Sequence, residues 1–147
     1  MFSFPPMRQD VVLPGYHNFA DRRAWLGVPN FLDVASNLPF LAIGALGMAR
    51  ARRVAERWER RAWNALFAGV ALTALGSAYY HWAPDNARLV WDRLPMTICF
   101  MSLFAIVIAE RIGPRRLASL IAIGAASVLY WRWVDDLRFY ALVQYFP

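Results

Sequence analysis

A serine, a histidine and an aspartate lie close together at a corner between two long apolar stretches of the sequence. Ser77 and His81 are four residues apart, so on a helix they share a face and lie one turn from each other. A Pro-Asp-Asn turn follows at Pro84, and Asp92 lies beyond it. We therefore expect His81 and Asp92 to face each other across an antiparallel helical hairpin.

These three residue types are the ones that metal-assisted hydrolysis uses. Histidine is the most common metal ligand, and a nearby carboxylate orients it or acts as base toward a metal-bound water. A hydroxyl one turn away can donate a hydrogen bond to a developing oxyanion. The spacing alone also fits a structural, hydrogen-bonded histidine, and Asp92 beside Arg93 also fits a local ion pair. Catalytic zinc usually has three protein ligands, and the only other histidine is His17.

A second polar group precedes the first apolar stretch. Asn30, Asp33 and Asn37 recur at helical spacing and share a face, and Asp21 lies shortly before them. Hard oxygen ligands of this kind suit calcium, so Asp21, Asn30 and Asp33 are candidate calcium ligands. The alternative is structural: Asn30 would cap a helix, Asp33 would favour the positive end of its dipole, and the amides would bond across membrane helices.

The elements that carry these residues are predicted to be membrane-spanning helices. The chain has 147 residues, of which 59% are hydrophobic and 16% aromatic, and its apolar residues form blocks of nearly the length that a membrane crossing needs. Trp and Tyr cluster at the block ends, as at membrane interfaces. We predict an all-α, polytopic transmembrane helical bundle in one domain. After a lead-in over residues 1–30, its helices cover about 31–49, 62–82, 90–110 and 115–133, and a fifth starts at 137.

The charge pattern predicts the orientation of these helices. All sixteen basic residues are arginines, and the net charge is +6. They gather in the connections around residues 50–61 and 111–116, which are expected to remain in the cytoplasm. The amino terminus and the candidate site then face the other side, in what we expect to be a bacterial inner membrane. Such short connections offer little surface for nucleic acid, so none is expected as a partner. The single cysteine, Cys99, excludes a disulfide framework.

Five segments together resemble the alkaline ceramidase (alkaline phytoceramidase) family in its bacterial branch. These segments are GVPNFLDVASNLPF, GSAYYH, PDNARLVWDRLPMT, SVLYWRW and DLRFYALVQYFP, and the resemblance extends from about Tyr16 to Pro147. The most specific element is Ser-x-x-x-His with its downstream aspartate. The family belongs to a superfamily of seven-helix membrane hydrolases, so the resemblance implies that this chain is the amino-terminal part of a seven-helix fold.

The resemblance also implies an activity. The expected protein is a zinc amidohydrolase that cleaves the amide bond of ceramide or a related N-acyl lipid, with that membrane lipid as substrate. His81 would be one of three histidine ligands of the zinc ion, Ser77 the hydroxyl that positions water or the oxyanion, and Asp92 the acid/base. The family's His-x-x-x-His element is absent from the sequence, so residues 1–147 alone are expected to be inactive. The alternative is a non-catalytic lipid-binding or receptor-like membrane protein of the same superfamily.

Overall fold

The computed structural model describes residues 5–113 and 116–146. Within these residues the only regular secondary structure is helical, so the prediction of an all-α helical bundle is confirmed. The lead-in contains one isolated bridge, between Trp25 and Val28. In chain order the helices are α1 (Gln9–Val12), α2 (Phe31–Ala35), α3 (Leu38–Ala51), α4 (Arg57–Trp82), α5 (Asn86–Arg111), α6 (Leu117–Val134) and α7 (Arg138–Tyr145).

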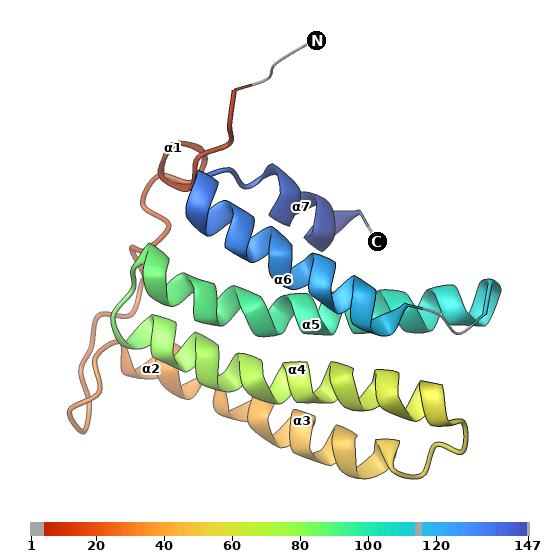
Figure 1. Ribbon diagram of the computed structural model, residues 1–147. Coiled ribbons are helices and arrows are strands. Elements are labelled where there is room, and N and C mark those ends of the chain that lie inside the picture. Colours follow the sequence, from red (N-terminus) through yellow and green to blue (C-terminus); the bar gives the residue numbers. More distant parts are fainter. Residues whose placement is uncertain (1–4, 114–115, 147) are drawn as a thin grey trace.

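The long helices α3 to α6 lie side by side in the order of the chain (Figure 1). Short connections make successive helices antiparallel neighbours, as in an up-and-down bundle. The most extensive contacts are those of α4 with α5 and with α3, followed by those of α6 with α5. The short helix α7 packs against α6, and α1 lies at the same end of the bundle (Figure 1). The lead-in, the α4–α5 corner and α7 therefore meet at one end.

Three segments among the described residues are long and apolar enough to cross a membrane. They are Phe31–Ala51, Asn86–Arg111 and Leu117–Val134. These segments make the chain a multi-pass membrane protein that resides in a lipid bilayer. The fourth predicted crossing, α4, has 26 residues but starts in a charged segment and ends in Tyr-Tyr-His-Trp, which lowers its hydropathy. It remains a prediction, which is favoured by the packing of α4 between α3 and α5.

The first predicted helix, over 31–49, is in fact two helices. The break falls at Ser36 and Asn37, whose side chains both donate to the Asp33 carbonyl oxygen, at 2.8 Å each. Such local bonds compete with the helical ladder, and Pro39 then occupies the first turn of α3. The other predicted helices keep their places with shifted ends. The predicted start at residue 115 and the first four residues of the lead-in lie outside the described residues.

Small residues allow the helix backbones to approach closely, as is common in membrane helix packing. A Cβ added at Gly76 of α4 would overlap the carbonyl oxygen of Trp91 in α5. That oxygen has no intrahelical N–H partner four residues on, because the residue there is Pro95. Four other helical glycines are comparably tight against the neighbouring helix: Gly44, Gly47, Gly69 and Gly124. The distance between α4 and α5 is therefore set by glycine at position 76, which has no side chain to hold the helices apart.

We expect Gly76→Ala to destabilise the bundle. In an open helix the change would stabilise by up to about 1 kcal/mol. Here the added methyl would displace backbone, and overpacking costs about 1–3 kcal/mol, so destabilisation should dominate. Thermal unfolding in detergent would measure the change, with Ala122→Val on an exposed face of α6 as the control. An unchanged or raised Tm would contradict the close approach.

The lead-in is attached to α7 by a buried carboxylate. Asp136 is 1% exposed, and it accepts hydrogen bonds from the Met7 amide, at 3.2 Å, and from the Arg138 guanidinium. The Leu137 amide in turn donates to the Met7 carbonyl oxygen at 2.8 Å. The hydrogen bonds from Arg138 are the main cause that lowers the pKa of Asp136 from 3.8 to about 2. The ionised form thus stabilises this end of the fold.

The Asp136 carboxylate should make stability pH-dependent in a defined window. Its folded pKa is depressed, so its contribution is complete above pH 3.8 and is lost as the pH falls toward about 2. We expect Asp136→Asn to cost about 1–3 kcal/mol near neutral pH and progressively less toward pH 2. Unfolding measured across this range, with exposed Asp10→Asn as the control, tests this. A difference that stays constant with pH would contradict it.

Candidate functional site

The α4–α5 hairpin places the predicted catalytic residues at one end of the bundle. Ser77 and His81 lie in the last turns of α4, and Asp92 lies early in α5. The corner between the helices is fixed by Asp85, whose side chain caps α5 by accepting from the Arg88 amide at 2.7 Å. This bond is the main cause that lowers the pKa of Asp85. The predicted helical hairpin is present.

Ser77 and Asp92 are brought together across this hairpin. The Ser77 side chain lies close to the Asp92 carboxylate, and both side chains are largely covered. Their neighbours in sequence explain why, because Gly76 and Trp91 form the close backbone contact between α4 and α5. Ser77 follows Gly76 and Asp92 follows Trp91 in the sequence. The absence of a side chain at Gly76 therefore sets the distance between the Ser77 hydroxyl and the Asp92 carboxylate. The sequence predicts the facing helices, and the structure adds the contact that sets their separation.

His81 offers a nitrogen that is not used for structure. Its Nδ1 atom is buried and has no hydrogen-bond partner. Its ring packs against Phe19 of the lead-in, with the ring centroids 4.5 Å apart. Two acids, Asp33 and Asp92, are near enough for their charges to act on the imidazole. The site thus contains an imidazole nitrogen without a hydrogen-bond partner, in the neighbourhood of two carboxylates.

Asp33 belongs to this neighbourhood as well. Its Oδ2 atom is buried and has no hydrogen-bond partner, like Nδ1 of His81. The sequence places Asp33 in the group of candidate calcium ligands and gives no sign that its charge acts on His81. Two buried polar atoms without partners at one place are uncommon, because burial without a hydrogen bond is costly. They mark this end of the bundle as a candidate site.

The three candidate calcium ligands do not share hydrogen-bond partners. Asp21 accepts from Arg23 Nε at 2.7 Å and from the Leu32 amide at 2.9 Å, and the Arg23 bond is the main cause that lowers its pKa. Asp21 and Asp33 line the same surface hollow. The Asn30 amide nitrogen instead donates to the His81 carbonyl oxygen at 2.8 Å. Calcium binding therefore stays a prediction.

The sequence correctly places Asn30 at the N-cap position of a helix, but the Asn30 side chain does not cap that helix. Asn30 occupies the position before α2 in a left-handed conformation, with φ of 47°, and its side chain makes no capping hydrogen bond. The amide is used at the end of α4, through its bond to the His81 backbone. Asn30 thus links the lead-in to the helix that carries the histidine.

The described residues do not form a metal centre by themselves. No group of three or more His, Cys, Asp or Glu side chains within 5–113 and 116–146 is arranged to hold a metal ion. His81 supplies one imidazole, whereas a catalytic zinc ion usually has three protein ligands. The residues present therefore do not fit a zinc ion unless further ligands are supplied.

His17 is a component of the site region that sequence reasoning did not assign. Its Nδ1 lies 2.8 Å from the Tyr80 hydroxyl, and its Nε2 lies 3.0 Å from Oδ1 of Asn86. Since that amide oxygen only accepts, Nε2–H is the donor to Asn86. His17 therefore joins the lead-in to both helices of the hairpin. No sequence signal could reveal this, because its partners lie more than sixty positions away.

The ion pair considered between Asp92 and Arg93 is not formed. Arg93 is 4% exposed, and its Nη2 donates instead to Oε1 of Gln9 at 2.8 Å. Neighbouring residues of a helix point about 100° apart, so adjacent charges on α5 turn to different surroundings. Asp92 belongs to the hairpin and Arg93 to the space between α5, α6 and α7.

In comparisons with known proteins, no family model, no curated protein and no solved structure matches the chain. The resemblance to alkaline ceramidases therefore remains a prediction from the sequence motifs. What the structure adds is the geometry of the hairpin and the bundle.

We expect His17→Ala to destabilise the fold because it removes two hydrogen bonds from partly buried partners. The loss should be about 1–3 kcal/mol in unfolding free energy. A double-mutant cycle with Asn86→Ala would isolate the coupling between the two residues. Strictly additive effects would show that the His17–Asn86 bond contributes nothing to stability.

Proposed function

We propose that the chain is part of a ceramidase-like integral membrane hydrolase that cleaves the amide bond of ceramide or a related N-acyl lipid. One observation carries the proposal. The hairpin gathers a hydroxyl, a carboxylate and an imidazole at one end of a membrane-embedded bundle, and Nδ1 of that imidazole is buried without a partner. The motif resemblance supports the choice of substrate, and the apolar helices support a lipid.

The chain's own residues suggest a division of roles. Asp92 would take a proton from the attacking water and later return it to the amine that leaves, which is general acid/base catalysis. Ser77, close to Asp92, would orient the water or donate to the oxyanion. His81 would place its free Nδ1 toward the reacting centre. All three act at the end of the bundle that the lead-in covers.

Zinc is part of the proposal only through the resemblance, with His81 as one ligand. The described residues do not complete a zinc site, so the proposal requires ligands from outside them, in a longer product or a second polypeptide. We also propose that Asp21, Asn30 and Asp33 bind calcium. The membrane would be a bacterial inner membrane, with the amino terminus and the site on the outer side.

A second candidate function is non-catalytic lipid binding. An apolar groove of about 270 Å³ lies between α2, α3 and α4, and it is lined by residues such as Val34, Leu41 and Leu75. A lipid acyl chain fits a surface of this composition. In that case the polar residues of the hairpin would hold α4 to α5 and would not react.

Substitutions at the hairpin test the hydrolase directly. The assay measures release of fatty acid from a fluorescent ceramide by protein produced from its own locus and purified from membranes, so that any further ligands are present. We expect His81→Ala and Asp92→Asn to lower the rate by at least about 100-fold. Ser77→Ala should lower it by about 100-fold through the loss of one donor.

His17→Gln is the matched control, because His17 is the only other histidine and its bonds are structural. Zinc measured in the same samples should be stoichiometric in the wild type and in this control, and absent from His81→Ala. Hydrolysis that survives His81→Ala would refute the catalytic role. A wild type with neither zinc nor hydrolysis, but with saturable lipid binding, would favour the second candidate.

A further inference from the structure

Arg93 is a buried cation without an acidic partner. Its guanidinium lies over three aromatic rings, with centroid distances of 4.1 Å to Trp131, 4.7 Å to Tyr140 and 5.7 Å to Tyr16. Its only hydrogen bond in the described chain is the one to Gln9, and none of the ion pairs there includes it. A charge out of water is costly unless it is paired, so this arrangement is incomplete.

The missing element is a hydrogen-bond acceptor. Nη1 of Arg93 is buried without a partner, and so is Nε2 of Gln9, whose side chain is fully buried. The two side chains are hydrogen-bonded to each other, so both unused donors belong to one neighbourhood. An oxygen of an anion would supply the acceptor that Arg93 lacks, and Arg93, unlike Gln9, lines a cavity.

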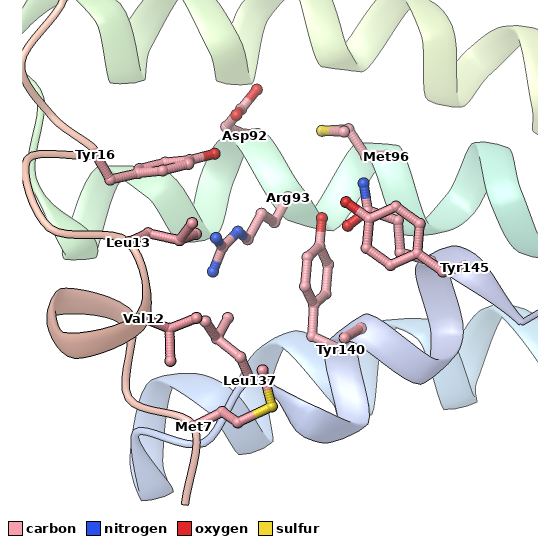
Figure 2. A pocket seen from close by; sticks show the side chains of 12 residues that line it. Met7, Val12, Leu13, Tyr16, Asp92, Arg93, Met96, Leu137, Tyr140 and Tyr145 are labelled. Carbon is pink, nitrogen blue, oxygen red and sulfur yellow. The ribbon is translucent and has the colours of Figure 1, made fainter.

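A cavity of about 310 Å³ adjoins this cation (Figure 2). Its walls come from the lead-in, α5 and α7, and they are mostly apolar. Asp92 contributes the only acid, and in Figure 2 its carboxylate and the Arg93 guanidinium leave α5 in opposite directions. The apolar part of the wall is formed by Met7, Val12, Leu13, Met96, Leu137 and Ala141. The volume is at the small end of the range for ligand sites.

The combination selects a class of ligand. One guanidinium balances one negative charge, and its planar fork matches a carboxylate with two parallel hydrogen bonds. A carboxylate brings one negative charge into a cavity that Asp92 also lines, whereas a phosphate dianion would bring two. The apolar walls suit the first part of a hydrocarbon chain.

We propose that Arg93 and this cavity bind the carboxylate end of a fatty acid. The inference goes beyond the proposed hydrolysis and holds whether or not the chain is an enzyme. If it is one, the ligand is the acid half of a cleaved N-acyl lipid.

Binding of labelled palmitate to the purified chain in nanodiscs tests the proposal, with no zinc and no turnover needed. We expect one palmitate per chain, and at least tenfold weaker binding of methyl palmitate, which lacks the charge. Arg93→Gln should weaken palmitate binding at least tenfold. Arg88→Gln, on the same helix but paired with Asp85, should leave it within twofold.

Ala141→Phe fills the cavity without touching the guanidinium, so it tests the site even if Arg93→Gln fails to fold. It too should weaken binding at least tenfold. Equal binding of the ester and the acid, or unchanged binding in Ala141→Phe, would overturn the proposal. Equally tight competition by phosphatidylglycerol would overturn the carboxylate assignment in favour of a lipid phosphate. Hydrolysis plays no part in these readouts, so failure here is separable from failure of the proposed function.

Discussion

The backbone contact between Gly76 of α4 and Trp91 of α5 is the constraint on which the candidate site depends. A glycine removes the side chain that would hold the helices apart, and Pro95 leaves the Trp91 carbonyl without its usual partner at the same place. The adjacent residues are Ser77 and Asp92, so the contact that packs the hairpin also sets the separation of the hydroxyl and the carboxylate. Packing and chemistry are specified by the same few positions.

The other polar residues of the candidate site lie at the same end of the bundle as this contact. The lead-in folds over that end through His17 and Phe19, and α7 closes it from the other side. The tightly packed apolar cluster, which includes Tyr80 and Trp131, lies there as well. Polar atoms are thus removed from water at the end of the bundle that the lead-in and α7 cover, and several of them have no hydrogen-bond partner in the described chain.

The sequence predicts much of this fold because its strongest signals are local. Apolar blocks locate the long helices, and Pro84 predicts the corner that turns Ser77 and His81 toward Asp92. The sequence does not predict contacts that join distant segments, such as the hydrogen bonds of His17 with Tyr80 and Asn86 in the hairpin. Arg93 shows the limit clearly. Its neighbour in sequence is an acid, yet its surroundings are aromatic rings from α6, α7 and the lead-in, which only the tertiary packing brings together.

The burial of Arg93 has a consequence for the order in which the protein assembles. A charged side chain on a lone helix in a bilayer is held near the interface, because its transfer to the hydrocarbon is costly. The rings and the amide that surround Arg93 come from Tyr16, Trp131, Tyr140 and Gln9, all on segments other than α5. The helix α5 can therefore reach its final depth only after these segments have arrived. The end of the bundle that carries the candidate site would therefore be the last part to form.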